Sequence, residues 1–492
     1  MGAEARKTGL PFVPDLSGAG GQRARSLHAQ LRGAILDGRL AADTPLPSSR
    51  ALAAQLGVAR NTVVAAYDLL VAEGYLLPRR RARPVVAQVR GRAAGATARV
   101  APVDDTRVAP FWRTPFLPAT PVPALPARSF RQGVGDHVHF PHATWRRLTA
   151  RALQAFAKQP FAYPPAAGLP ALRAAIARHV AVARAVACSP ADVVATSGAH
   201  QAFDLLARLL VTPGSTRVAV EEPGYPPLRA AFAAAGAQLV PMPVDDEGLC
   251  VERLREAHAD VVLATPSHQS PTGAALSLRR RIALLDLARS RNMVVVEDDY
   301  DGEFRFGGRP LDALQTLDRD GLVFYVGTFS KTLFPALRQG FIVAPPWARE
   351  MLTQVKACVD SHSPAVTQAV LAAFVEEGHM ARHVRRMHAI YATRRAALLE
   401  GIAALDRWLR PIPSEAGMHM AARLRDPADA RRVFAALREH APGARSLADY
   451  AMAPLAEPGV VFGYGVIDAD EIRERMRALR RALERTGRRA AQ

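Results

Sequence analysis

One lysine that directly follows a buried apolar run is the residue of this sequence with the clearest potential for chemistry. Residues 323–326 predict a buried strand, Gly327 ends it, and a short polar turn leads to Lys331, with Arg338 seven residues later. A desolvated lysine near another cation loses its proton readily and becomes an amine nucleophile. A P-loop is excluded, because Ser330 stands where a glycine would have to precede the Lys-Thr pair. The lysine is therefore either at the rim of a sheet or forms a Schiff base, which needs partners elsewhere.

Carboxylates and a phenol follow another predicted strand. Residues 293–297 form a mostly apolar run, and Asp298 and Tyr300 come directly after it. Pyridoxal phosphate acts as an electron sink only while its ring nitrogen is protonated, which requires a carboxylate beside it. A phenol near the ring oxygen would tune the bond to the lysine. Both groups lie at the carboxyl end of a strand, where open α/β sheets bind ligands. Together with Lys331 and Arg338 they favour a pyridoxal phosphate site over a solvated acidic rim.

The motifs around these residues resemble those of one protein family. Residues 328–338 and 297–305 are similar to segments of the MocR (GabR-type) subgroup of GntR regulators, which join a winged helix-turn-helix to a fold-type-I aminotransferase-like domain. The resemblance covers nearly the whole chain apart from a linker. It implies that Lys331 is the Schiff-base lysine and Asp298 the partner of the pyridine nitrogen. It also implies that Tyr300 contacts the ring oxygen and that the arginine of the first segment binds the phosphate.

The resemblance extends to a phosphate site. After the apolar run 192–196 come Ser197, Gly198 and Ala199, which open an expected helix whose backbone N–H groups would hold the cofactor phosphate. Family members commonly keep a hydroxyl or amide residue after the glycine, so the alanine is a departure. A backbone donor does not depend on the side chain. Ser330, beside the lysine, belongs to the same expected cofactor-binding set.

Two further segments concern the cofactor ring. Tyr225 follows another apolar run and takes the place of the ring that stacks on the pyridine in the family, while a tyrosine packed in a turn is an equally good interpretation. Residues 265–273 are similar to the Asn-Pro-Thr-Gly turn of aminotransferases, with Ser270 in place of the asparagine that contacts the ring oxygen. Whether Ser270, Gln269 or His268 takes over that contact stays open.

Two positions concern the partner subunit and the effector. Tyr163 resembles the tyrosine that reaches the phosphate of the neighbouring subunit, which implies a homodimer with shared sites, arranged head-to-tail in the family. Residues 414–419 and 460–465 are similar to a family turn and to the last strand near the active site. An aminotransferase needs an arginine in this region to hold the substrate carboxylate, and Arg445 is the nearest candidate by position.

We expect no metal site. His379 and His383 have a metal-like i, i+4 spacing, but the glutamate of metalloproteases is absent between them and arginines surround them. Residues 378–388 instead resemble a family helix that enters the small subdomain. The three cysteines, at positions 188, 250 and 358, are far apart and odd in number, which indicates reduced structural residues in a cytoplasmic protein.

A sheet is needed to bring these residues together. From about residue 145 the chain alternates helical and short apolar segments, as a mostly parallel sheet with helices on both faces does. We therefore predict an α/β multidomain protein in which a small α+β subdomain follows the large sheet. The predicted strands are residues 192–196, 217–220, 260–264, 293–297, 322–326 and 341–344.

The first ninety residues carry a separate pattern. Leu27, Leu31 and Ile35 share one helical face, and two further helices are joined by a turn at Gly57, which is the helix-turn-helix signature. The third helix would enter the major groove, and a basic two-stranded wing would contact phosphates. The order of these segments resembles the GntR winged helix, although the wing is rich in arginine where the family has glycine. The expected DNA-binding residues are Ser49, Arg50, Arg60, Asn61, Thr62, Arg79, Arg80 and Arg81.

Composition agrees with this organisation. The net charge of +19 favours an anionic partner such as nucleic acid. No apolar run approaches the roughly 18 residues of a membrane span, and no signal peptide is recognisable, so we expect a cytoplasmic protein. The predicted domains are an N-terminal tail (1–20), a winged helix (21–88), an Ala/Arg/Pro-rich linker (89–125) and an aminotransferase-like domain (126–492) whose small subdomain begins at about residue 386.

These observations predict a transcriptional regulator that depends on pyridoxal phosphate. A small amine or amino acid, or the cofactor itself, would control its binding to an operator in double-stranded DNA. One alternative is a working aminotransferase with a DNA-binding appendage, because the catalytic set is complete enough for half-reactions. A third possibility is a repressor in which the cofactor is purely structural.

Overall fold

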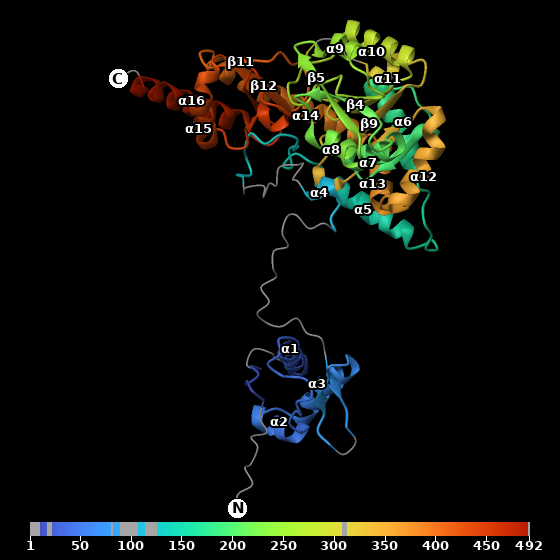
Figure 1. Cartoon of the computed structure of the whole chain (residues 1–492), viewed down its shortest axis with the longest axis vertical. Coiled ribbons are helices and arrows are strands. Elements are labelled where there is room, and N and C mark those ends of the chain that lie inside the picture. Colours follow the sequence, from blue (N-terminus) through green and yellow to red (C-terminus); the bar gives the residue numbers. More distant parts are fainter. Residues whose placement is uncertain are drawn as a thin grey trace, which may run out of the picture. The chain divides into compact units, whose positions relative to one another are not determined.

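The structure is a computed structural model that describes residues 10–16, 22–79, 82–88, 107–113, 125–307 and 312–490. The chain forms two compact units, Met1–Thr114 and Pro115–Gln492 (Figure 1). Arg80 and Arg81, most of the expected linker and most of the expected N-terminal tail lie outside the described residues. In the described ranges, no helix combines the length and the apolar character needed to cross a membrane.

The described part of the first unit contains a helix-turn-helix followed by a wing. The Ser48 hydroxyl caps the second helix by accepting from the Ala51 N–H at 3.2 Å, and Gly57 ends that helix in the left-handed region with φ 65°. The wing is an antiparallel strand pair. The elements are α1 (Arg23–Leu36), α2 (Ser49–Leu56), α3 (Arg60–Ala72), β1 (Leu76–Leu77), β2 (Val85–Val86) and the short α4 (Pro110–Arg113).

The helices of this unit pack around one apolar core. Leu27, Leu31 and Ile35 of α1 are buried, as their spacing predicts, and they pack against α2 and α3. The ring of Tyr67 closes the core from α3, and its hydroxyl donates to the Pro47 carbonyl at 2.9 Å. This bond ties the start of α2 to the middle of α3, so the two helices keep a fixed relative orientation.

An eight-stranded sheet forms the centre of the second unit, in the order β3-β10-β9-β8-β7-β4-β5-β6. The neighbouring strands β9, β8, β7, β4 and β5 are parallel to one another, whereas β10 is antiparallel to both β3 and β9. All six predicted runs are strands, while β5 and β6 were not predicted. The strands are β3 (Val193–Thr196), β4 (Arg217–Glu222), β5 (Gln238–Asp245), β6 (Gly248–Leu249), β7 (Val261–Ala264), β8 (Val294–Asp299), β9 (Val323–Thr328) and β10 (Gly340–Val343).

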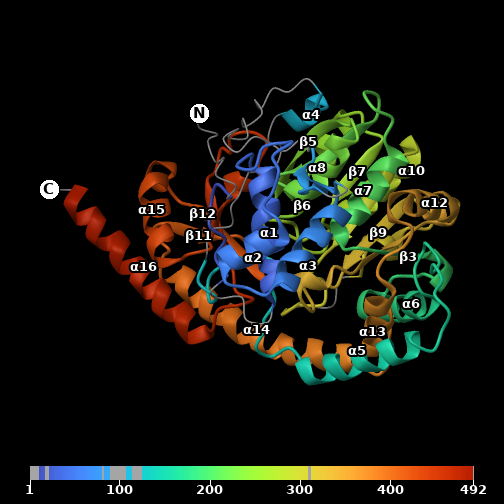
Figure 2. The same ribbon diagram turned by 90° about the horizontal axis from the view of Figure 1, so that it is seen from below.

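Helices cover both faces of this sheet because successive strand residues alternate between the faces. In β8, Val295 packs in the same cluster as residues of α9 and α10, whereas Val296 packs with residues of α7, α8 and α12. On the first of these faces α13 also packs against α5 and α6 (Figure 2). The helices are α5 (His142–Phe156), α6 (Pro170–Arg184), α7 (Ala199–Leu210), α8 (Pro226–Ala234), α9 (Val251–Glu256), α10 (Leu278–Arg291), α11 (Leu314–Leu317), α12 (Arg349–Asp360) and α13 (Ala365–Glu376).

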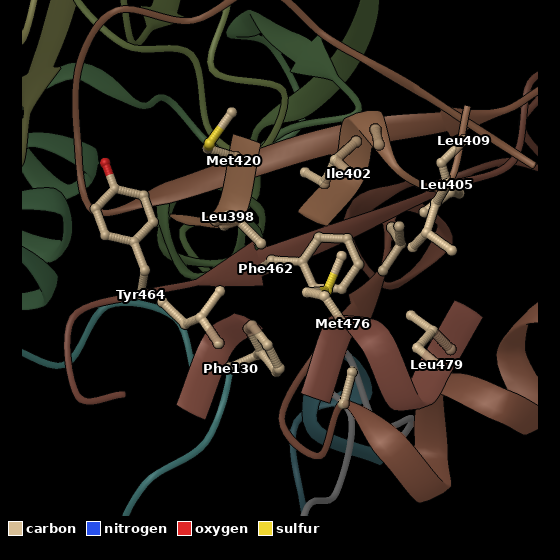
Figure 3. Close-up of a cluster of buried hydrophobic side chains, with 14 of the residues drawn as sticks. Phe130, Leu398, Ile402, Leu405, Leu409, Met420, Phe462, Tyr464, Met476 and Leu479 are labelled. Carbon is tan, nitrogen blue, oxygen red and sulfur yellow. The ribbon is translucent and has the colours of Figure 1, made fainter. Parts of the chain in front are cut away.

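A smaller α+β subdomain follows. Its four-stranded antiparallel sheet has the order β11-β12-β14-β13. Apolar side chains from the helices and from this sheet meet in a buried cluster, in which Phe462 of the sheet faces Ile402 and Met476 of two helices (Figure 3). The elements are α14 (His379–Ala403), β11 (Leu409–Pro411), β12 (His419–Leu424), α15 (Ala430–His440), β13 (Arg445–Ser446), β14 (Gly459–Gly463) and α16 (Ala469–Ala490).

Candidate functional site

A cavity of about 250 Å³ opens at the carboxyl ends of β8 and β9 and the N-terminus of α7. Open α/β sheets bind ligands at this edge, because the strand ends and helix N-termini converge there. The cavity brings together residues from segments that are far apart in the sequence. Its lining residues are Gln132, Gly133, Ala199, His200, Tyr225, Ser270, Asp298, Tyr300, Thr328, Ser330, Lys331, Pro335, Arg338, His419 and Tyr450.

Two adjacent carboxylates at the end of β8 have different surroundings. Because side chains alternate along a strand, Asp298 points to the cavity side, whereas Asp299 points to the opposite face. There Asp299 accepts from Arg184 Nε at 2.6 Å and from the Tyr325 hydroxyl at 2.8 Å. Asp298 is 3 % exposed, and its Oδ1 has no hydrogen-bond partner among the described residues. Burial, followed by repulsion from Asp299, raises the pKa of Asp298 well above its usual value.

Lys331 lies half-buried in the cavity wall, after the turn that ends β9. Its Nζ donates to the carbonyl of Gly133 at 2.9 Å. Burial lowers the pKa of Lys331 and the nearby Arg338 guanidinium adds to that effect, while the carboxylates of Asp301 and Asp298 oppose it. A lowered pKa increases the fraction of the neutral, nucleophilic amine.

An anion site is built where β3 meets α7. Gly198 has φ +87°, and a Cβ atom at this position would lie 2.8 Å from the Arg338 guanidinium, so only glycine leaves the arginine in place. Arg338 donates from Nη2 to the Ser197 carbonyl at 2.9 Å. The Ser330 hydroxyl is buried and has no hydrogen-bond partner among the described residues. An arginine, a helix N-terminus that begins at Ala199 and an unpartnered hydroxyl together suit a phosphate group.

The aromatic wall of the cavity contains Tyr225 and Tyr300. The Tyr225 hydroxyl lies 3.1 Å from His200 Nε2. The Tyr300 hydroxyl lies 3.0 Å from His268 Nδ1, and it also bonds to the Ser270 side chain. Both phenols line the cavity.

Four predicted residues are absent from the cavity lining. Ser197 and Gly198 adjoin it behind Arg338, whereas Tyr163 and Arg445 lie away from it. Tyr163 is 88 % exposed, and its ring lies 6.0 Å from that of His362. Arg445 does not line the cavity; its Nε donates to Asp449 at 2.7 Å, within the same segment. The arginine expected to clamp a carboxylate is thus paired with an acidic neighbour.

Several lining residues were not identified from the sequence. Gly133 stands 198 residues before the lysine that it contacts, and no motif marked it. Gln132, His200, His419 and Tyr450 had no role assigned either. The structure shows why a glycine stands there: the φ of Gly133 is +68°, and a Cβ atom would lie 2.4 Å from Lys331 Nζ.

The residues fit pyridoxal phosphate better than a metal ion. A buried carboxylate oxygen without a partner suits a protonated pyridine nitrogen, and Ser330 and Arg338 suit the phosphate. Within the described residues, His268, Asp301 and His419 bring their ligand-type atoms to within 4.8 Å of one another. We interpret them as hydrogen-bonded groups, because His268 Nδ1 already faces Asp301 and His419 Nε2 faces the Pro271 carbonyl at 3.1 Å.

The predicted DNA-binding residues that the structure describes lie at the starts of α2 and α3 and in the wing after β1. Arg60 Nε lies 3.4 Å from the Ser49 hydroxyl, so the starts of α2 and α3 meet there. Arg50, Arg60, Asn61 and Arg79 are exposed, whereas Ser49 and Thr62 are half-buried. This arrangement leaves the N-terminal turn of α3 free to enter a groove.

Comparisons with known sequences identify two domains. Residues 135–444 match the family model "Aminotransferase class I and II", and residues 23–86 match "Bacterial regulatory proteins, gntR family". The "Probable rhizopine catabolism regulatory protein MocR" of Rhizobium meliloti is 36 % identical over 462 residues, 93 % of each chain. The "HTH-type pyridoxine biosynthesis transcriptional regulator PdxR" of Corynebacterium glutamicum is 33 % identical and covers 91 % of this chain and 93 % of its own.

Solved structures resemble the second unit. α-Aminoadipate aminotransferase LysN from Thermus thermophilus, complexed with N-(5'-phosphopyridoxyl)-L-leucine, has a TM-score of 0.65 and 30 % identity, covering 72 % of this chain and 92 % of its own. Kynurenine aminotransferase from Pyrococcus horikoshii has a TM-score of 0.66 and 27 % identity, covering 73 % of this chain and 91 % of its own. The fold is therefore that of fold-type-I aminotransferases.

Proposed function

The chain belongs to the MocR/GabR-type subfamily of the GntR regulators, and on that premise we propose that it is a transcriptional regulator controlled through pyridoxal phosphate on Lys331. A small amine or amino acid, or the cofactor itself, is the proposed effector. The observation that carries the proposal is the presence, in one chain, of a winged helix-turn-helix and a cavity lined by Lys331, Asp298 and Arg338.

The proposed cofactor-binding roles follow from the surroundings of each group. Pyridoxal phosphate supplies an aldehyde that condenses with amines and a ring that withdraws electrons. Lys331 attaches the cofactor, and the buried Asp298 accepts from the ring nitrogen, which would give its Oδ1 a partner. Arg338 and Ser330 hold the phosphate. These assignments are supported by the orphaned oxygen atoms and by the lowered pKa of the lysine.

The remaining proposed contacts come from the aromatic wall and from a second subunit. Tyr225 stacks on the ring and Tyr300 donates to the ring oxygen, since both phenols line the cavity. The exposure of Tyr163 supports a role outside its own subunit, at the phosphate of a homodimer partner.

Regulation requires that the effector bind one domain arrangement better than another, because equal affinity for both would shift nothing. We infer that an effector amine competes with Lys331 for the cofactor, which releases the lysine and changes the contacts at the cavity mouth. Allosteric couplings are typically about 1–3 kcal/mol, which corresponds to a change of roughly 5- to 150-fold in DNA affinity.

The test uses the full-length protein loaded with pyridoxal phosphate and a duplex selected by that protein from a random library. Fluorescence anisotropy of the labelled duplex measures its affinity while candidate amines and amino acids are added. The proposal expects at least one of them to change the affinity in the wild-type protein and not in Lys331→Ala. If a panel of amines, amino acids and free pyridoxal phosphate left the wild-type affinity unchanged, the proposal would be wrong.

A working aminotransferase with a DNA-binding appendage is the second candidate. It is supported by the lining of Lys331, Asp298, Tyr300 and Arg338 in one cavity and by the likeness to the α-aminoadipate enzyme. Multiple-turnover transfer of an amino group from an amino acid to a keto acid would favour it. Full ligand-dependent regulation in Lys331→Ala would instead favour a purely structural cofactor.

A further inference from the structure

A buried histidine stands behind the phenol of Tyr300, outside the set of groups proposed to touch the cofactor. His268 is 2 % exposed, and its Nδ1 lies 3.0 Å from the Tyr300 hydroxyl. The same nitrogen lies 3.1 Å from each carboxylate oxygen of Asp301. One nitrogen atom thus contacts both a phenol of the cavity and a buried carboxylate.

The backbone fixes the position of this imidazole ring. Gly417 and Gly273 both lie in the left-handed region, with φ +82° and +83°. A Cβ atom at Gly417 would lie 2.0 Å from His268 Cε1, and one at Gly273 would lie 3.2 Å from His268 Nε2. The ring of His419 lies on the imidazole with centroids 4.5 Å apart. Because both glycines leave room only for the ring, His268 can take few other orientations.

The contacts determine which atom carries the proton, since Nδ1 holds one at most. Asp301 also accepts from the Met418 N–H at 3.2 Å, so its oxygen atoms act as acceptors here. If Tyr300 donated to Nδ1, two electron-rich atoms of His268 and Asp301 would face each other at 3.1 Å without a proton between them. In addition, His268 Nε2 would carry a buried N–H, and this nitrogen has no partner among the described residues. Nδ1–H is therefore the donor. The hydrogen bond of the Ser270 side chain opposes the rise in the pKa of Tyr300, as a donor to the phenol oxygen does, so the Tyr300 proton is left to point into the cavity.

We infer that His268, held by Asp301, is a positioning residue that directs the hydroxyl proton of Tyr300 toward the ring oxygen of the cofactor. This inference rests on the proposed function. It also distinguishes the three residues that the sequence left open for the ring-oxygen contact, which an asparagine makes in aminotransferases. Gln269 donates to Glu221 and to the Pro223 carbonyl, so it is held away from the cavity. Ser270 lines the cavity and can contact the ring oxygen itself, whereas His268 acts through the Tyr300 hydroxyl. The charged and titratable groups around that phenol are Asp298, Asp301, Glu221, Lys331, His268 and His419.

The test measures the pH midpoint of the visible absorption band of bound pyridoxal phosphate in the full-length protein. A hydrogen bond from Tyr300 stabilises negative charge on the ring oxygen, so its loss should raise the midpoint. His268→Gln places its amide near Nε2 and removes the donor at Nδ1, whereas His268→Asn keeps a donor close to the Nδ1 position. We expect Tyr300→Phe and His268→Gln to raise the midpoint by about one unit, a tenfold change in proton affinity. His268→Asn should stay near the wild-type value.

A double variant separates positioning from a general structural effect. If His268 acts through the phenol, Tyr300→Phe combined with His268→Gln should give the midpoint of Tyr300→Phe alone. Should His268→Gln fail to fold, Asp301→Asn takes its place in the same comparison, because it removes the carboxylate that fixes the Nδ1 proton. The inference would be overturned if the midpoint of the folded His268 or Asp301 variant equalled that of the wild type, or if the shifts in the double variant were fully additive. In either case a visible band in the wild-type protein would leave the proposed function standing. A wild-type protein with no visible band at any pH would overturn both.

Discussion

Replacing Asp298 with asparagine should stabilise the cofactor-free protein against unfolding and lower its affinity for the cofactor. The carboxylate is 3 % exposed, and its Oδ1 has no partner among the described residues. A buried polar group without a partner costs about 1–3 kcal/mol, and more when it is charged. The amide is also unpartnered but carries no charge, so we expect the free energy of unfolding to rise by about 1 kcal/mol at neutral pH.

The pH dependence has a definite sign. Burial and the charge of Asp299 raise the pKa of Asp298, against the attraction of Lys331. A group whose pKa is raised on folding contributes stability that is complete below its unfolded value, about 3.9, and is lost as pH rises through the folded value. The cofactor-free wild-type protein should therefore lose this contribution as the pH rises above about 4, and Asp298→Asn should lack that loss.

The adjacent Asp299 provides the matched control. It forms a buried pair with Arg184, and both side chains are almost fully enclosed. Breaking such a pair leaves a buried charge and costs roughly 3–5 kcal/mol, so Asp299→Asn should destabilise the protein. Two identical changes at neighbouring positions should thus have opposite effects on stability.

The assay combines denaturant unfolding of the cofactor-free variants at several pH values with a titration of pyridoxal phosphate followed by absorbance. A hydrogen bond to a charged group is worth about 1.5–3 kcal/mol and a neutral one about half of that, so Asp298→Asn should lower cofactor affinity about tenfold. A variant that binds the cofactor as tightly as the wild type, or that unfolds more readily without it, would refute the reasoning.

Two further predictions concern the phosphate site and the DNA surface. Gly198→Ala should lower pyridoxal phosphate affinity about tenfold or more, because a Cβ atom would displace the Arg338 guanidinium. Gly214→Ala is the control: Gly214 also has a positive φ, +75°, but open space surrounds its Cβ position. Both variants should lose about 1–2 kcal/mol of stability, and only Gly198→Ala should lose cofactor affinity. Equal cofactor affinities for the two variants in an absorbance titration would contradict this. Arg60→Ala should weaken binding to the selected duplex by about 1–3 kcal/mol in fluorescence anisotropy, because the exposed guanidinium at the start of α3 reaches a base edge or a phosphate. Arg208→Ala removes the same charge from the second unit and should leave the affinity unchanged; an equal loss in both variants would mean that net charge alone drives binding.

The sequence predicted the central strands because each apolar run is followed directly by polar residues. Strands β3, β8 and β9 lie where residues 192–196, 293–297 and 322–326 predicted them, and the residues after them meet in one cavity. Strand β5 was missed for a physical reason. Its residues are largely half-buried or exposed and include two prolines, so neither a continuous apolar run nor a clear alternation marks it.

Contacts between distant segments were the part that sequence patterns could not supply. Gly133 reaches Lys331 only because the chain folds back over the cavity, and a loop glycine carries no periodic signal. The sequence left His268, Gln269 and Ser270 as equal candidates, since only their hydrogen-bond partners distinguish them. Arg445 had the right residue type at an approximate position, and its pairing with Asp449 could not be foreseen from spacing.

The central claim is that Lys331 binds pyridoxal phosphate through its ε-amine in a DNA-binding protein. Borohydride reduction of the purified protein after incubation with pyridoxal phosphate, followed by mass spectrometry of its peptides, tests it most directly. We predict that the cofactor becomes covalently attached to the peptide that contains Lys331, and to no other lysine in stoichiometric amount. An unlabelled Lys331 peptide, or stoichiometric labelling at another lysine, would contradict the account.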